Sequence, residues 1–164
     1  MKKTFLLSLL FALVSTMAIW AQQTPETASN DFTYTTTATA TNGKMHFTSA
    51  KLYYKAPANT MRFSLKESGA YYKNGKNRLS FDSFELFNSK GEKVSLSAAD
   101  FSGNYNKPYA YMLDGNNDTY CCGSWSANDE GHDYFEIELT TDLGGSFSFS
   151  FITENTTMNP KAFR

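Results

Sequence analysis

Cysteine and histidine are scarce in this chain, which has two of each among its 164 residues. Two cysteines are too few for a disulfide-dense scaffold or for a zinc site of four thiolates. Two histidines leave little for a histidine-rich metal centre. Basic residues are not in excess either, since the formal net charge is −1. This balance excludes a strongly basic nucleic-acid-binding protein.

Catalytic motifs are also missing from the sequence. There is no Gly-x-Ser-x-Gly elbow, no phosphate-binding glycine loop and no His-Glu-x-x-His motif. Glu136 and Glu138 lie two positions apart on an expected strand, about 6.6–6.8 Å along the backbone, so their spacing alone leaves a glycosidase pair open. Acidic residues on the outer face of a strand usually face solvent, however. We therefore expect a non-catalytic protein, with a small glycoside hydrolase as the less favoured alternative.

Aromatic residues, in contrast, are abundant at 16% of the chain, with 14 Phe and 10 Tyr. Such residues fit the half-buried surfaces of β-sheets. Apolar and polar residues alternate in short stretches separated by turns, and no long helical periodicity follows the N-terminal segment. The clearest expected strands cover residues 47–54, 61–66, 79–87, 134–139 and 147–151. The pattern predicts an all-β fold, either an antiparallel β-sandwich or a jelly roll.

Two local signals refine this pattern. The dipeptide Asn42-Gly43 lies between two expected strands and predicts a β-hairpin with a two-residue turn. Between residues 79 and 87 the apolar alternation slips by one position. A slip of this kind is typical of an extra residue in one strand, so it predicts a β-bulge at Asp82-Ser83.

The first residues have the pattern of a secretory signal peptide. A positively charged start is followed by an apolar stretch over residues 5–19 and by Ala21, which predicts a signal peptide over residues 1–21. The apolar stretch is shorter than the roughly 20 residues that span a bilayer, although an uncleaved anchor is the alternative. Residues 22–31 are expected to form a flexible leader and residues 32–164 a single domain. We expect a secreted, periplasmic or cell-surface protein with no membrane insertion after cleavage.

Oxygen-bearing side chains gather around Gly115, in the stretch of residues 114–119. A hard cation such as calcium takes about six to eight oxygen ligands, and this loop supplies carboxylate, amide, hydroxyl and carbonyl oxygens. The EF-hand pattern is absent, because the loop has no glutamate at its twelfth position. An ordinary Asp-Gly turn, with side chains bonded to the loop backbone, explains the same residues, and the spacing alone favours this turn.

Several stretches of the chain resemble one known family. They are Asp114–Tyr120 with the following Ser124-Trp125, Tyr134–Leu139, and the expected strand Leu79–Phe87. Together they are similar to the discoidin or coagulation factor V/VIII type C domain, a galactose-binding-like sandwich family that includes the family-32 carbohydrate-binding modules. The resemblance covers roughly residues 45–164.

The resemblance implies one structural calcium ion beneath the loops. Its ligands would be the side chains of Asp114, Asn116, Thr119 and Glu85 and the backbone carbonyls of Tyr111 and Phe84. The order of the motifs departs from the family, because the strand with the glutamate precedes the Asp-Gly loop. The resemblance associates this permuted order with secreted proteins of Bacteroides-like bacteria. The final residues 159–164 resemble a turn entering a further strand, so we expect a domain whose last strand is very short or missing.

Aromatic and polar residues of the loops are the candidate ligand-binding residues: Trp125, Tyr105, Tyr109, Tyr120, His132 and Arg78. An aromatic ring packs against the apolar face of a sugar while polar side chains bind its hydroxyl groups. Packing is the alternative role of Trp125, and capping of the next strand is that of His132. We expect a binding module for carbohydrate or another cell-surface ligand. The alternative is a structural or protein-interaction domain of the bacterial envelope.

Overall fold

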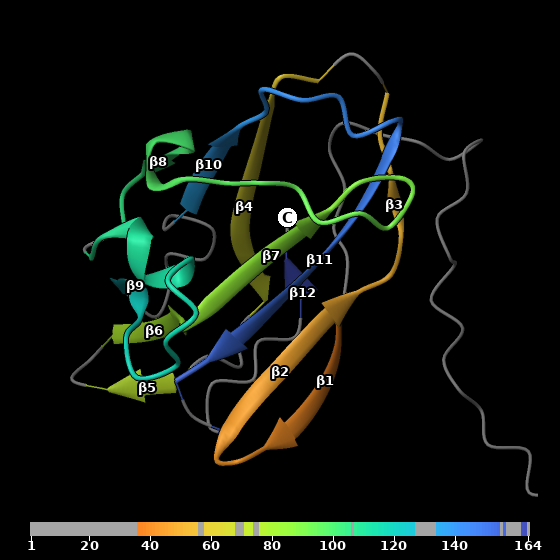
Figure 1. Cartoon of the computed structure of the whole chain (residues 1–164). Helices are drawn as coiled ribbons and strands as arrows, with labels where there is room; N and C mark the ends of the chain where they lie inside the picture. Colours follow the sequence, from red (N-terminus) through yellow and green to blue (C-terminus); the bar gives the residue numbers. More distant parts are fainter. Residues whose placement is uncertain are drawn as a thin grey trace, which may run out of the picture.

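The computed structural model describes residues 36–55, 58–67, 71–73, 76–105, 107–126, 134–154, 156 and 162–163. The expected signal peptide and leader lie outside these residues. The described chain consists of short antiparallel strands together with the 3-10 helices η2 (Ala98–Asp100) and η3 (Tyr109–Met112) (Figure 1). Within the described ranges, no helix has both the length and the hydropathy that a membrane span requires.

Two antiparallel sheets form the body of the fold (Figure 1). The five-stranded sheet contains β1 (Thr36–Thr41), β2 (Lys44–Ser49), β3 (Leu52–Tyr53), β7 (Ser83–Phe87) and β11 (Ser146–Thr153). The central strand is β11, which pairs with β2, β3 and β7. The four-stranded sheet has the order β12 (Ala162–Phe163), β4 (Thr60–Glu67), β10 (Tyr134–Glu138) and β8 (Phe101–Gly103).

A smaller sheet contains β5 (Tyr71–Lys73), β6 (Lys76–Phe81) and β9 (Cys121–Ser126), in that order. The chain passes from β6 to β7 through the single residue Asp82, so the small sheet joins the five-stranded sheet at this point. The strand β9 begins directly after the loop of residues 113–120, which follows η3. This arrangement places the loop next to the junction of the two sheets.

Phenylalanine side chains fill the space between the two larger sheets. The ring of Phe63 in β4 is 1% exposed and lies 5.4 Å from that of Phe149 and 6.0 Å from that of Phe151, both on the facing sheet. Within its own sheet, Phe63 stacks on Phe135 at 5.0 Å. Two antiparallel sheets therefore pack through an aromatic core, which confirms the all-β class and is consistent with a β-sandwich.

The hairpin expected at Asn42-Gly43 is confirmed. The turn joins β1 to β2, and its two residues have φ angles of +52° and +78°. Asn and Gly tolerate such positive values, which suit the twist of the flanking strands. The strand expected over residues 47–54 is divided between β2 and β3.

The prediction of a β-bulge at Asp82-Ser83 is wrong, because the expected strand 79–87 is two strands. The strand β6 ends at Phe81 and pairs with β9, whereas β7 begins at the next residue but one and pairs with β11. The backbone N–H of Asp82 donates a hydrogen bond of 2.8 Å to a carbonyl oxygen of β11. Phe81 and Phe84 are both buried. The slip in the apolar alternation thus marks the point where the chain changes sheets.

Candidate functional site

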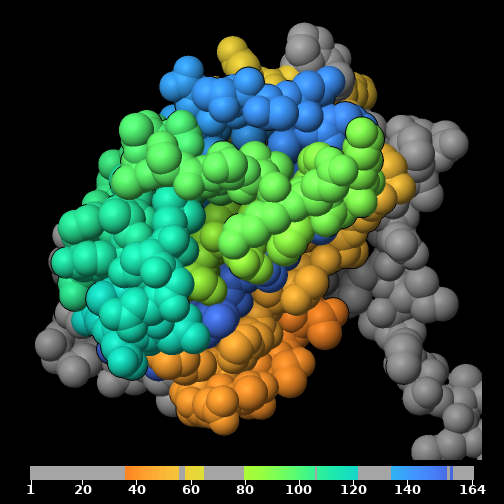
Figure 2. All heavy atoms as spheres, in the orientation of Figure 1, coloured from red at the N-terminus to blue at the C-terminus, as the bar shows by residue number. Residues whose placement is uncertain are grey.

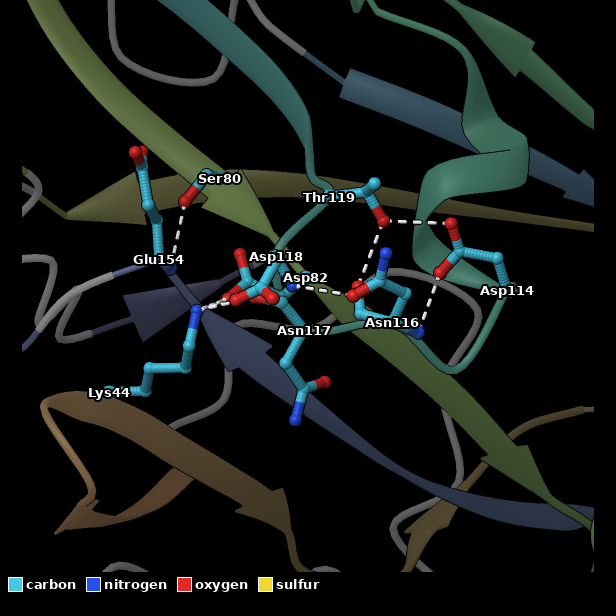
Figure 3. A network of polar contacts seen from close by, with 9 residues as sticks. All are labelled: Lys44, Ser80, Asp82, Asp114, Asn116, Asn117, Asp118, Thr119 and Glu154. Atoms are coloured by element: carbon cyan, nitrogen blue, oxygen red, sulfur yellow. Dashed lines mark hydrogen bonds and ion pairs between the residues drawn. The ribbon is translucent and has the colours of Figure 1, made fainter.

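The loop of residues 113–120 carries the Asp-Gly motif and is held by hydrogen bonds of its own (Figure 3). Asp114 Oδ1 accepts the backbone N–H of Asn116 at 2.8 Å, and the Thr119 hydroxyl donates to Asp114 Oδ2 at 2.7 Å. The pKa of Asp114 is lowered mainly by the hydrogen bond from the N–H of Asn116 and, to a smaller extent, by the hydrogen bond from the Thr119 hydroxyl. The Asn116 side-chain oxygen accepts the N–H of Asp118 at 3.0 Å. Asp114 and Asn116 therefore make the bonds of two successive Asx turns.

Glu85, the other predicted acidic ligand, lies in β7 and is bonded to its neighbours on the sheet. Its carboxylate accepts hydrogen bonds from Lys93 Nζ at 2.8 Å and from the Ser150 hydroxyl at 3.2 Å. The hydrogen bond from Lys93 is the main reason that the pKa of Glu85 is lowered. Within the described part of the chain, no hydrogen bond joins Glu85 to the loop of residues 113–120.

The predicted carbonyl ligands belong to elements that touch each other. Tyr111 lies in η3 and Phe84 in β7, and these two elements are in contact. The side chain of Phe84 is buried in the core, and its backbone pairs with β11. Over the described ranges, no three His, Cys, Asp or Glu side chains are grouped so as to hold a metal ion. The calcium site stays a prediction drawn from the resemblance.

A buried ion pair lies where the loop of residues 113–120 meets the sandwich (Figure 3). Asp82, between β6 and β7, has a side chain that is only 1% exposed, and its Oδ2 lies 2.5 Å from Nζ of Lys44 in β2. The same ammonium group donates to the backbone carbonyl of Asn117 at 2.5 Å. Figure 2 shows the loop, in teal, against the orange β1–β2 hairpin at the surface. Lys44 thus joins the hairpin, the sheet junction and the loop.

The electrostatics of this junction are set by the burial of Asp82. Burial raises the pKa of its carboxyl group, while the hydrogen bond and the charge of Lys44 lower it. The carboxylates of Glu154 and Asp118 raise it further. Among the described residues, Asp82 Oδ1 has no hydrogen-bond partner. Sequence reasoning missed this site, although an aspartate inside the apolar stretch 79–87 was a signal for it.

Two of the predicted ligand-binding tyrosines pack against the edge of the core. The ring of Tyr105 lies 5.9 Å from that of Phe81 and 5.6 Å from that of Phe135. Tyr109 stacks on Phe101 at 5.5 Å, and burial raises the pKa of its hydroxyl group. Both side chains are half-buried. Their rings stabilise the core from its edge.

The remaining predicted ligand-binding residues lie around the small sheet. Tyr120 precedes β9, and the Lys107 ammonium is 3.9 Å above the centre of its ring, a cation–π contact. Arg78 lies in β6 and Trp125 in β9, and these strands pair. The side chains of Arg78 and Trp125, and all of His132, lie outside the described part of the structure.

An exposed aromatic side chain stands directly before the loop. Tyr111 in η3 is 38% exposed, and it is the large hydrophobic residue that the described structure leaves in solvent. The side chains of Asn116, Asn117 and Asp118 in the loop that follows are also exposed. Sequence reasoning gave Tyr111 a role through its carbonyl only, because the sequence carries no signal for the direction of its ring.

The two glutamates weighed as a glycosidase pair lie on the outer face of β10. Glu136 Oε1 accepts a hydrogen bond from Arg62 Nε at 2.8 Å and forms an ion pair with Arg62 Nη2 at 2.6 Å. The guanidinium of Arg62 also lies 4.1 Å above the ring of Tyr134. Glu138 is exposed. Glu136 is therefore an ion-paired surface residue.

Comparison of the chain with protein-family models, with curated proteins and with solved structures gives no match. Its function must therefore be argued from its own residues. Those with the clearest binding chemistry are the exposed Tyr111, the polar loop that follows it, and the ion pair that holds this loop.

Proposed function

We propose that this chain is a secreted, non-catalytic, discoidin-like module that binds glycans at a shallow surface formed by η3 and the loop of residues 113–120. Secretion is supported by the signal-peptide pattern of residues 1–21. A β-sandwich with loops at its ends supports a binding module, because rigid sheets position loops that carry the ligand contacts.

The observation that carries the proposal is the exposure of Tyr111 beside an amide-rich loop. A tyrosine ring in solvent offers a flat apolar face for a sugar ring. The exposed side chains of Asn116 and Asn117 offer amide donors and acceptors for sugar hydroxyl groups. The combination of one aromatic platform with a few polar groups is the chemistry of small polar ligands.

The loop is also ordered before it meets a ligand. Asp114 and Thr119 close it from inside, and Lys44 ties it to the sheet. A loop held in this way loses little conformational freedom on binding, which supports affinity. The residues of this proposed surface are exposed, so single-site binding is expected to be weak and to gain from several copies acting together.

A glycan array probed with the mature chain, residues 22–164, tests the proposal. We expect binding to a defined glycan class, and Tyr111→Ala should weaken it about tenfold, equivalent to about 1.4 kcal/mol. Tyr134→Ala is the matched control, because it removes a partly exposed aromatic ring from β10, outside the proposed surface, and should bind as the unmodified chain does. A silent array, or equal binding by Tyr111→Ala, would contradict the proposal.

A protein-interaction role is the second candidate, and the strand β1 supports it. All its residues from 37 to 41 are exposed, none is charged, and within the described structure β1 pairs with β2 alone. An uncharged edge strand is a template for an added strand from a partner. Capture of a defined surface protein that Thr39→Lys abolishes, together with a silent array, would favour this role.

A hydrolase role has its own test. Turnover of generic aryl glycosides that Glu136→Gln or Glu138→Gln abolishes would replace the binding proposal. The ion pair of Glu136 with Arg62 speaks against this outcome, because the carboxylate oxygen that would have to act on a substrate is already engaged by the guanidinium.

A further inference from the structure

The carboxylate and amide oxygens that the resemblance assigns to calcium already accept hydrogen bonds from the protein. Both carboxylate oxygens of Asp114 and the side-chain oxygen of Asn116 accept hydrogen bonds within the loop. The carboxylate of Glu85 accepts from Lys93 and Ser150. A calcium ion needs about six to eight oxygens directed at one point, at about 2.3–2.6 Å. The predicted ligand set does not fit this requirement.

A different positive charge lies against the same loop. The Lys44 ammonium sits between a carboxylate oxygen of Asp82 and the backbone carbonyl of Asn117, at 2.5 Å from each (Figure 3). An ammonium group has three hydrogen-bond donors and needs only a few oxygens around it. The geometry of the junction therefore suits a lysine, whereas the described residues contain no group of three acidic, cysteine or histidine side chains that could hold a divalent cation.

We propose that the Lys44 ammonium group is a built-in substitute for a metal ion, which holds the loop of residues 113–120 onto the sandwich without calcium. Three separate parts of the chain meet at this one charge: the strand β2, the junction of β6 with β7, and the loop. This role concerns the fold of the loop and holds whatever ligand the loop binds.

The surroundings of Asp82 explain why a cation is required there. Its side chain is 1% exposed, and a buried carboxylate without a counter-charge is strongly unfavourable. The acidic groups that face it, Asp118 and Glu154, make the local charge still more negative. Of the described residues, Lys44 provides the cation that reaches this point, and 22% of its side chain stays exposed. The lysine stem thus spans from the surface to the buried carboxylate.

Thermal unfolding of the mature chain tests this role in two ways. The midpoint of the unmodified protein should be the same in millimolar calcium and in excess chelator. Lys44→Met, which keeps the length of the stem and removes the charge, should lower the midpoint by roughly 10 °C, because it leaves a buried carboxylate unpaired.

The matched control is Lys93→Met, which breaks the exposed pair with Glu85, whose side chains are 62% and 41% exposed. Exposed pairs contribute little, so this midpoint should fall by about 2 °C or less.

If Lys44→Met does not fold, the double variant Lys44→Met/Asp82→Asn removes both charges and should recover a folded protein. A midpoint that rises with calcium in the unmodified chain, a Lys44→Met variant as stable as Lys93→Met, or a double variant that gains nothing over Lys44→Met would overturn the proposal.

Discussion

Asp82 shows how one residue can set the electrostatics of a whole junction. Its carboxylate is buried, and its ion-pair partner Lys44 also donates to the loop of residues 113–120. Burial raises its pKa, and the partner lowers it without cancelling the effect of burial. The folded protein therefore binds a proton at Asp82 more readily than the unfolded chain does.

This difference predicts how stability changes with pH. A raised pKa in the folded state means that the contribution of Asp82 is fully present below its ordinary pKa of 3.8 and is lost as the pH rises through the raised folded value. The free energy of unfolding of the unmodified protein, measured relative to Asp82→Asn, should therefore increase as the pH falls from 7 toward 4. Urea unfolding of both proteins at a series of pH values measures this difference in the free energy of unfolding.

Asp142 gives a control of opposite sign. Its carboxylate accepts the N–H of Gly144 at 2.9 Å and the Tyr54 hydroxyl at 3.0 Å, and these bonds lower its pKa below 3.8. The contribution of Asp142 to stability is present above pH 3.8 and is lost as the pH falls through the lowered pKa of the folded state. The difference between the unmodified protein and Asp142→Asn should stay flat from pH 7 to 5. A slope for Asp142→Asn in that range, or none for Asp82→Asn, would contradict the assignment.

At the scale of single residues, sequence reasoning succeeded where the local backbone decides the outcome. Asn42-Gly43 favours a two-residue turn whatever the surrounding residues are, and the hairpin is present. It failed at Asp82, because the meaning of a charge within an apolar stretch depends on Lys44, which is 38 residues away in the chain. The direction of the Tyr111 ring depends in the same way on the packing of η3.

At the scale of elements, the pairing of β8 with β10 requires a glycine. Gly103 has a φ of +129°, and a Cβ at this position would lie 2.9 Å from the Cα of Phe135 and closer still to the carbonyl oxygen of Tyr134. Backbone atoms of a paired strand cannot move aside without breaking the ladder. The glycine therefore permits the close approach of the two strands.

Gly103→Ala should lower the free energy of unfolding by about 3 kcal/mol, from the positive φ and the steric overlap together. Gly91→Ala is the matched control, since Gly91 has a φ of +79° with no atom within 4 Å of the added Cβ. In this control only the strain of the positive φ acts, so the free energy of unfolding should fall by about 1 kcal/mol. Urea unfolding compares the two. Equal losses would show that the approach of β10 does not constrain position 103.

Strands with regular alternation were predictable at this scale, and sheet membership was not. Residues 147–151 alternate strictly, and β11 contains them. The stretch 79–87 is one run in the sequence but two strands in different sheets, because the partner of each half comes from a distant part of the chain. Alternation reports which face is buried and contains no information on the partner strand.

At the scale of the whole molecule, the aromatic composition explains the core. The rings of Phe63, Phe84, Phe135, Phe149 and Phe151 contact one another across both sheets. Edge-on and stacked rings each add to the burial of apolar area. An all-β sandwich was therefore predictable from composition and alternation, whereas the family was not, because many sandwich families share this pattern.

Phe63 is the centre of this core, so its removal tests the architecture as a whole. Its ring is 1% exposed and contacts rings of both sheets. Phe63→Ala should lower the free energy of unfolding by about 4 kcal/mol, because it removes buried area and leaves a cavity that the rigid sheets cannot close. That loss is a large part of the roughly 5–15 kcal/mol typical of a whole domain. Tyr111→Ala is the control: its side chain is 38% exposed, so the free energy of unfolding should change by less than about 0.5 kcal/mol in the same urea titration. If Phe63→Ala lost no more than Tyr111→Ala, the two sheets would not be held together by this aromatic core.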